Sequence, residues 1–223
     1  DEPWTHRGRF VPDALRAVAE LSPDENLLVM EDSNALRLYD VRRRCELPPP
    51  AGGDDIPSIS FDGRYLVAEA YNAATVYDIQ LQTSRKIDDV RYAVFAPHDP
   101  LLAIVELEGE LVRLEDPVTG EVKTEIDLGF ENDPATFCVF TPDGKHLLTG
   151  DHRDQARLWN IATGEESALP EKRPRLYYQP VFSPHGQRLA LLRDGETMTI
   201  CDVRQWTQMA EVKLPSRAVE FRF

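Results

Sequence analysis

The stretch Val139-Phe140-Thr141-Pro142-Asp143-Gly144 is an apolar run that ends in a reversing turn. Two further runs follow it, Leu147-Leu148-Thr149-Gly150 and the alternating Ala156-Arg157-Leu158-Trp159-Asn160. Proline presets φ at the first corner of such a turn, and glycine accepts the positive φ at its end. Apolar runs of about four residues between turn signals are too short for a core helix, so this stretch predicts consecutive β-strands.

The pattern occurs five times between Ser22 and Asp202. The turn after the first run recurs as Ser22-Pro23-Asp24-Glu25, Ser60-Phe61-Asp62-Gly63, Ala96-Pro97-His98-Asp99 and Ser183-Pro184-His185-Gly186. The turn after the third run begins at Asp40, Asp78, Asp116, Asn160 and Asp202, at spacings of 38, 38, 44 and 42 residues. A period of about 40 to 45 residues is typical of units built from four strands. The sequence therefore predicts an all-β fold with almost no helix.

The repeats resemble those of the WD-repeat β-propeller family, in a degenerate, bacterial-type form. The fourth repeat matches most closely, through Thr141 to Gly144, Asp154, and Trp159-Asn160 with Ala162-Thr163-Gly164 behind it. The resemblance covers about nine tenths of the chain and implies a single domain, a β-propeller of four-stranded antiparallel blades. The blades are expected at approximately residues 14–48, 54–88, 90–128, 134–170 and 175–214, with the first strand of a sixth blade at 216–223.

The repeats depart from the family at one structural position. Tyr39, Tyr77, Glu115 and Cys201 stand where the family usually has Trp, and no repeat shows the Gly-His pair that typically precedes the first strand. The family's buried Asp-His-Ser/Thr-Trp network lacks its His here, so Asp154 is not expected to hold that structural role.

The second and third strands have different expected environments. The second strand is a continuous apolar run, as in Leu101 to Val105, and is expected to be buried on both faces. The third alternates, as in Leu36-Arg37-Leu38-Tyr39, and is expected to have one packed and one wetter face.

Composition excludes some classes of protein. The chain has 223 residues, 42% of them apolar, which is enough for a substantial core. No apolar run exceeds five residues, whereas a membrane helix needs about 20. The three cysteines, Cys45, Cys138 and Cys201, are interpreted as small hydrophobes, and no cofactor or metal is expected. A cytoplasmic location is favoured, although a chain that opens on Asp1 gives no information on a signal peptide.

The resemblance places the loops from fourth to first strand, and from second to third strand, on one rim that usually binds partners. These loops carry Glu31, Asp32, Asp88, Asp89, Glu106, Glu108, Glu110, Glu131, Asp133, Asp151, Asp154, Asp194 and Glu196. At a net charge of −14, such clustering also fits a solvated surface that keeps the chain soluble. The functional alternative is a rim that attracts a basic peptide or protein partner, with an affinity that falls as salt rises.

Two basic clusters interrupt the acidic sequence. Arg42-Arg43-Arg44 follows Asp40 in a hairpin, where long charged side chains discourage unwanted strand pairing. Lys172, Arg173 and Arg175 lie beside Tyr177 between the fourth and fifth repeats, and form either a binding contact or a plain loop. Nucleic acid is not an expected partner, because a phosphate-binding surface needs more clustered cations.

Catalysis has little support in the sequence. None of the five histidines accompanies a nucleophile motif, and Asp151-His152-Arg153-Asp154 is the one tight cluster of acid, base or metal ligands. The expected function is a non-catalytic interaction scaffold or sensor module, with no catalytic residues. The alternative is a metal-dependent propeller hydrolase or lactonase-like enzyme, whose ligands at the channel mouth would include Glu31, Glu108, Asp151 and Asp154.

The two ends of the sequence leave two architectures open. Arg217 to Phe223 resembles the innermost strand of a sixth blade, and Trp4 to Phe10 resembles a leftover outer strand. The chain is expected to be a fragment of a longer ring; in the alternative, its terminal pieces pair to close a small one. A fragment would expose blade edges and apolar faces, and would self-associate through them.

Overall fold

A computed structural model describes residues 19–22, 24–32, 35–48, 58–108, 110–129, 135, 137–150, 156–167, 169, 180–183, 186–192 and 196–214, with the side chains of 19–20, 31–32 and 35–36 left out. Within these ranges the chain consists of strands, turns and bends, and contains no helix. This confirms the predicted all-β class.

Five antiparallel four-stranded sheets follow one another along the chain, each a simple meander in sequence order. Sheet 1 contains β1 (Ala19–Leu21), β2 (Leu27–Asp32), β3 (Ala35–Asp40) and β4 (Cys45–Leu47). Sheet 2 contains β5 (Ser58–Ile59), β6 (Tyr65–Ala70), β7 (Ala73–Asp78) and β8 (Thr83–Asp88). Sheet 3 contains β9 (Val90–Phe95), β10 (Leu102–Glu106), β11 (Leu111–Glu115) and β12 (Val122–Asp127). Sheet 4 contains β13 (Phe137–Phe140), β14 (His146–Gly150), β15 (Ala156–Asn160) and β16 (Glu166–Ser167). Sheet 5 contains β17 (Val181–Phe182), β18 (Arg188–Leu192), β19 (Thr197–Asp202) and β20 (Thr207–Lys213).

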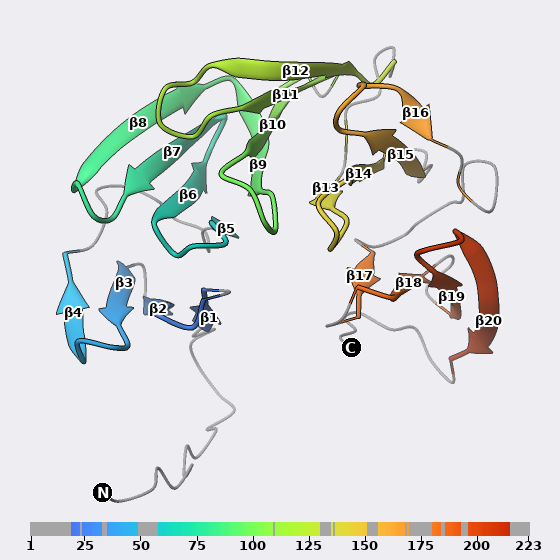
Figure 1. Cartoon of the computed structure of the whole chain (residues 1–223), viewed down its shortest axis with the longest axis horizontal. Coiled ribbons are helices and arrows are strands. Elements are labelled where there is room, and N and C mark those ends of the chain that lie inside the picture. The colour runs from blue at the N-terminus through green and yellow to red at the C-terminus, as the bar shows by residue number, and fades with distance from the viewer. Residues whose placement is uncertain are drawn as a thin grey trace, which may run out of the picture.

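The sheets are arranged side by side in an arc (Figure 1). The first strand of each sheet lies on the inside of the arc and the fourth on the outside, with sheets 1 and 5 at its two ends. The predicted partial blade at 216–223 lies outside the described residues.

A side-chain hydroxyl organises the turn after the first strand. The Ser60 hydroxyl donates to Asp62 Oδ1 at 2.7 Å and accepts the backbone N–H of Tyr65 at 2.8 Å. Ser22 and Thr141 make the same pair of bonds, and Ser183 accepts the amide of Arg188 at 3.0 Å. Because the turn residues satisfy each other locally, the motif specifies a hairpin without help from the rest of the fold.

A carboxylate or amide organises the turn after the third strand. Oδ1 of Asp78 accepts the backbone N–H groups of Gln80 and Leu81 at 3.0 and 2.9 Å. Asp116, Asn160 and Asp202 each accept two amides in the same way. Four residues after this position the backbone enters the left-handed region in all five sheets, at Arg44, Gln82, Gly120, Gly164 and Trp206. Glycine, which adopts this conformation without strain, is present at this position in two of the five hairpins.

The apolar core is divided into four clusters, one between each pair of consecutive sheets. Neighbouring residues of one strand belong to different clusters. On β10, Leu102 and Ile104 pack with sheet 2, whereas Ala103 and Val105 pack with sheet 4. All four are fully buried, which confirms that the second strand is packed on both faces.

The third strand follows its predicted alternation only in part. Arg37 is exposed beside the buried Leu38, and Arg157 is half-buried between buried neighbours. The third strand ends at an Asp or Asn, and the residue just before it lies on the face that was predicted to be wetter. In sheets 2 to 5 this residue is buried, because the preceding sheet covers it. In sheet 4 this residue is Trp159, whose Nε1–H donates to Thr149 Oγ1 at 2.9 Å. This bond satisfies a polar group that burial would otherwise leave unpaired. Asp154 lies outside the described residues.

The cysteines are all free. Cys138 and Cys201 are buried, as expected of small hydrophobes, and burial raises the pKa of the Cys138 thiol far above its ordinary value. Cys45, in contrast, is exposed.

No helix among the described residues has the length and hydropathy to traverse a bilayer.

Candidate functional site

The expected acidic rim is described in part. Asp88, Asp89, Glu108, Glu110 and Glu196 are exposed, and Glu106 is half-buried. Glu31 and Asp32 lie at the end of β2, where only their backbone is described. Several expected rim residues lie outside the described ranges, namely Glu131, Asp133, Asp151, Asp154, Lys172, Arg173, Arg175, Tyr177 and Asp194.

A backbone hydrogen bond joins two loops of this rim. The N–H of Leu107, in the β10–β11 hairpin, donates to the carbonyl oxygen of Asp89, in the connection between sheets 2 and 3, at 2.8 Å. Asp89 has a positive φ of 59°, which turns the chain sharply between β8 and β9. The bond therefore brings Asp88 and Asp89 beside Glu108, although they come from different sheets.

The charges of this cluster are only partly compensated. Lys86 Nζ lies 2.7 Å from Asp88 Oδ1 in an exposed ion pair, and Arg113 Nε lies 3.5 Å from Glu106 Oε1. Among the described residues, Asp89, Glu108 and Glu110 take part in no ion pair. These three exposed carboxylates leave the rim between sheets 2 and 3 with an excess of negative charge, and we call Asp88, Asp89, Glu108 and Glu110 the acidic rim cluster.

Arg91 binds backbone carbonyl oxygens next to the acidic rim cluster, and the sequence did not predict this role. Its Nε donates to the carbonyl oxygen of Ala135 at 2.7 Å, and its Nη1 donates to that of Leu107 at 3.5 Å. Glu69 similarly links sheets 2 and 3, because its Oε1 accepts the N–H of Ala93 at 2.6 Å. In the sequence, Arg91 and Glu69 are each a single charged residue within a predicted strand, and this pattern does not show which group such a residue binds.

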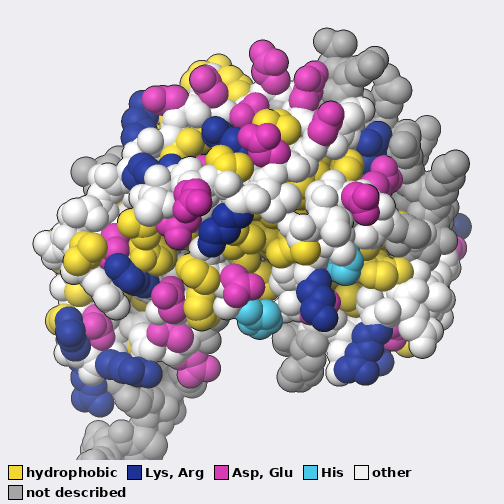
Figure 2. Space-filling model, turned by 45° about the horizontal axis from the view of Figure 1, so that its top comes forward, with side chains coloured by type: hydrophobic (Ala, Val, Ile, Leu, Met, Phe, Trp, Pro, Cys, Tyr) yellow, Lys and Arg dark blue, Asp and Glu magenta, His cyan; other side chains and the backbone are white. Residues whose placement is uncertain are grey.

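The acidic side chains do not form one continuous surface. Figure 2 shows Asp and Glu spread over the visible face and interleaved with Lys and Arg. The negative charge is therefore in excess only locally, at loops such as those that carry the acidic rim cluster, and is not spread evenly over the molecule.

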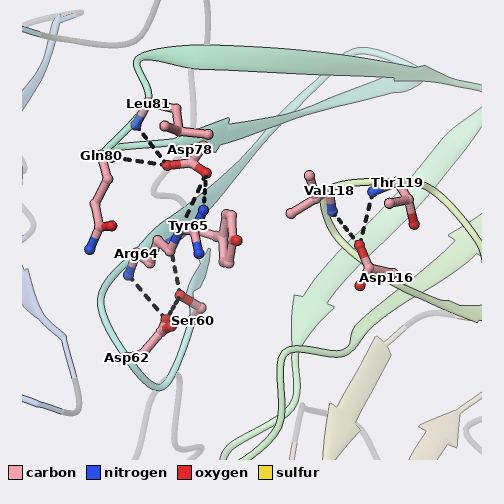
Figure 3. A network of polar contacts seen from close by, with 10 residues as sticks. All are labelled: Ser60, Asp62, Arg64, Tyr65, Asp78, Gln80, Leu81, Asp116, Val118 and Thr119. Carbon is pink, nitrogen blue, oxygen red and sulfur yellow. Dashed lines mark hydrogen bonds and ion pairs between the residues drawn. The ribbon is translucent and has the colours of Figure 1, made fainter.

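A second polar network lies at the opposite ends of the strands (Figure 3). Arg64 donates to Oδ2 of the buried Asp78 through Nη2 at 2.9 Å and Nε at 3.2 Å, and its guanidinium lies over the Tyr65 ring. Burial alone would raise the pKa of Asp78, but the amides of Leu81 and Gln80 and the Arg64 guanidinium outweigh it and lower the pKa. Burial raises the pKa of Tyr65.

A shallow pocket of about 90 Å³ lies next to this network, between sheets 2 and 3. It is lined by Tyr65, Val76, Asp78, Thr83, Ser84, Arg85, Pro117 and Val118. Arg85 Nη2 lies 2.5 Å from Oε1 of the buried Glu115 and also donates to the carbonyl oxygen of Pro117 at 3.2 Å. The contacts of Arg85 with Glu115 and Pro117 tie sheets 2 and 3 together, whereas the pair of Arg64 and Asp78 lies within sheet 2.

The metal-site alternative has no assembled ligand set in the described part of the chain. No group of three or more His, Cys, Asp or Glu side chains converges there. His98 contacts the carbonyl oxygen of Pro142 through Nε2 at 2.7 Å, and His146 packs edge-on against Trp206. These two histidines therefore make contacts between neighbouring sheets.

No protein-family model matches the chain, and no curated protein matches it.

Proposed function

We propose that the five sheets are blades of a β-propeller and that the chain is a non-catalytic interaction module, which binds a basic peptide segment of a partner protein at the acidic rim cluster. The meander order of every sheet and the inward position of every first strand support the propeller assignment. In such a fold the strands serve as a rigid support, and loops carry the function.

The observation that carries the proposal is the hydrogen bond between the Leu107 N–H and the Asp89 carbonyl oxygen. It fixes the backbones of two acidic loops against each other on ordered strands, so the loops that carry these carboxylates are already side by side before a partner arrives. A site whose groups are already positioned loses less conformational entropy on binding.

Electrostatics would govern the approach of the partner. Exposed carboxylates attract Lys and Arg side chains over about 8 to 10 Å at physiological salt. Such rim charges mainly raise the association rate and select against acidic competitors. Lys86 competes with the partner for Asp88, so we expect Asp89 and Glu108 to contribute more than Asp88.

The experiment is a binding titration of lysine- and arginine-rich peptides, followed by fluorescence anisotropy. Asp89→Lys/Glu108→Lys should weaken the tightest binder by at least about tenfold at low salt. The matched control, Asp99→Lys/Glu121→Lys, makes the same change in net charge at exposed positions on the opposite ends of the strands, and should weaken it far less. If both double variants lost the same affinity for the peptide, the effect would come from the change in net charge alone, and the proposed site would be refuted.

The alternative, a metal-dependent hydrolase, makes a different prediction. Calorimetric titration with calcium, zinc and manganese should give no stoichiometric binding if the interaction proposal holds. A site of micromolar or tighter affinity that is lost in Glu108→Gln would instead favour the enzyme.

A further inference from the structure

The pocket between sheets 2 and 3 contains a buried polar group that the fold does not use. Tyr65 lines this pocket and is only 5% exposed, and its hydroxyl forms no hydrogen bond with any described residue. A tyrosine hydroxyl usually finds a hydrogen-bond partner when the residue is buried. Every residue that lines the pocket belongs to the ranges 58–108 and 110–129, so sheets 2 and 3 form it by themselves.

The hydroxyl of Tyr65 can be reached through the pocket. Figure 3 shows the Tyr65 ring between the pair of Arg64 and Asp78 and the turn that contains Val118, with the hydroxyl on the side of this turn. The hydroxyl oxygen is not enclosed by protein atoms, unlike Oγ1 of Thr199, which is buried without a partner. A group that enters the pocket can therefore form a hydrogen bond with Tyr65.

The repeat explains why a pocket exists at this contact between sheets. His146 of sheet 4 stands where sheet 2 has Tyr65, five residues after the turn hydroxyl. The His146 ring packs edge-on against Trp206 of sheet 5, which comes four residues after Asp202. The equivalent of Trp206 in sheet 3 is Gly120, which has no side chain to pack against Tyr65. The place that an indole ring takes between sheets 4 and 5 is therefore open between sheets 2 and 3.

The size and the walls of the pocket limit what it can hold. Its volume of about 90 Å³ is smaller than a cavity of about 150 Å³, which is the size that takes up benzene. Its walls combine the apolar side chains of Val76 and Val118 with the hydroxyls of Tyr65, Thr83 and Ser84. A small group with hydrogen-bonding atoms matches these walls better than an aromatic ring does.

The charges around the pocket favour a neutral group. The two buried acids at this contact, Asp78 and Glu115, are bonded to Arg64 and Arg85. A carboxylate in the pocket would lie close to the two acids, and an ammonium group would lie close to the Arg85 guanidinium. Either would add an uncompensated charge to a partly desolvated site. A primary amide is neutral, and it carries both a hydrogen-bond acceptor and two donors.

We propose that this pocket binds the side-chain amide of an asparagine or glutamine of a partner protein. The amide oxygen accepts a hydrogen bond from the Tyr65 hydroxyl, and the amide nitrogen donates to the hydroxyl oxygens of Thr83 and Ser84. A free amide of this size makes too few contacts to bind tightly, so a polypeptide that also covers the exposed Val118 is the expected source. The pocket and the acidic rim cluster lie at opposite ends of the strands, so this proposal and the proposed function can fail independently.

The pocket can be tested by NMR titration of the full chain with acetamide, acetate and methylammonium. Acetamide should give saturable shifts of the Ser84 and Val118 amide signals, with a dissociation constant of about 1 to 100 mM, whereas acetate and methylammonium should not. Tyr65→Phe should weaken acetamide binding at least about fivefold, because it removes one hydrogen bond. Tyr71→Phe changes an exposed tyrosine of the β6–β7 hairpin in the same way, and this control should bind like the wild type.

Two further measurements address the hydroxyl and the source of the amide. Tyr65→Phe should change the melting temperature by less than about 2 °C, because the hydroxyl has no partner among the described residues. A blocked glycyl-glutaminyl-glycine peptide should bind at least as tightly as acetamide, and the matching glutamyl peptide should not bind.

Four results would overturn the proposal. They are the absence of a saturable shift with acetamide, equal binding of acetate, unchanged binding in Tyr65→Phe, and a clear loss of stability in that variant, which would show that the fold already uses the hydroxyl. Binding of acetamide without binding of the glutaminyl peptide would overturn the assignment of the pocket to a partner protein.

Discussion

Arg85 on β8 and Glu115 on β11 form an ion pair that joins sheets 2 and 3, with Nη2 and Oε1 2.5 Å apart. Glu115 is only 3% exposed, and the equivalent position of sheet 4 holds the buried Trp159. A buried carboxylate is tolerated here because a guanidinium from the neighbouring sheet compensates its charge. The pair thus replaces an apolar contact between sheets by a polar one.

Removing the arginine of this pair should be costly. Arg85→Ala leaves the buried Glu115 carboxylate without its partner, so we expect a loss of about 2 to 3 kcal/mol in the free energy of unfolding, below the usual range because Arg85 is partly exposed. The apolar double variant Arg85→Met/Glu115→Leu should recover most of this loss. Urea denaturation measures both, and a double variant as unstable as Arg85→Ala would contradict the explanation.

Gln82 occupies a backbone conformation that favours glycine. Its φ is 54°, at the position where sheets 3 and 4 have Gly120 and Gly164. Gln82→Gly should stabilise the protein by about 0.5 to 1 kcal/mol, because the relief of the left-handed strain exceeds the entropy that glycine adds to the unfolded chain. Gln80→Gly, in the same hairpin at a residue without positive φ, should destabilise it. Thermal melts of the two variants should shift in opposite directions.

The Ser60 hydroxyl should contribute measurably to stability. Ser60→Ala removes the acceptor of the Tyr65 amide and the donor to Asp62, so we expect a loss of about 1 to 2 kcal/mol. Sheet 3 provides the control, since Ala96 has no hydroxyl and the Leu101 N–H donates to the Asp99 carbonyl oxygen instead. Ala96→Ser should therefore give little or no gain in chemical denaturation.

Asp78 should make the fold sensitive to acid. Its pKa is lowered in the folded protein, so its contribution to stability is present above the unfolded pKa of about 3.9 and is lost as pH falls through the folded pKa. Asp78→Asn should reduce the steepness with which the free energy of unfolding falls below about pH 4. An NMR titration should also show that Arg64→Met raises the pKa of Asp78. An unchanged pKa would contradict the role of this guanidinium.

The sequence predicted the local features of the fold well and the contacts between sheets poorly. Turns such as Ser60 to Gly63 and Thr141 to Gly144 carry their own hydrogen-bonding groups, so a short stretch is sufficient to recognise them. The pair of Arg85 and Glu115 spans 30 residues and depends on the packing of two sheets, which strand periodicity does not encode. The left-handed residues Gln82 and Trp206 were missed because no glycine marks them, although all five hairpins place a residue with positive φ at this position.

For the site, the sequence predicted which loops are acidic but not how they meet. Asp89 lies beside the β10–β11 hairpin because its carbonyl oxygen accepts the backbone N–H of Leu107. A pattern of side chains in the sequence does not predict a backbone hydrogen bond of this kind. Arg91 was missed because its role is to bind carbonyl oxygens of two loops, and a single arginine in a strand gives no sign of this.

The most direct test of the proposed function is the rate at which a basic peptide associates with the chain at different ionic strengths. We predict that stopped-flow association slows by at least about tenfold between about 0.05 and 0.5 M salt, and that Asp89→Lys/Glu108→Lys removes most of this dependence. An association rate that is independent of salt, or a salt dependence that the double variant retains in full, would contradict a partner-binding role for the acidic rim cluster.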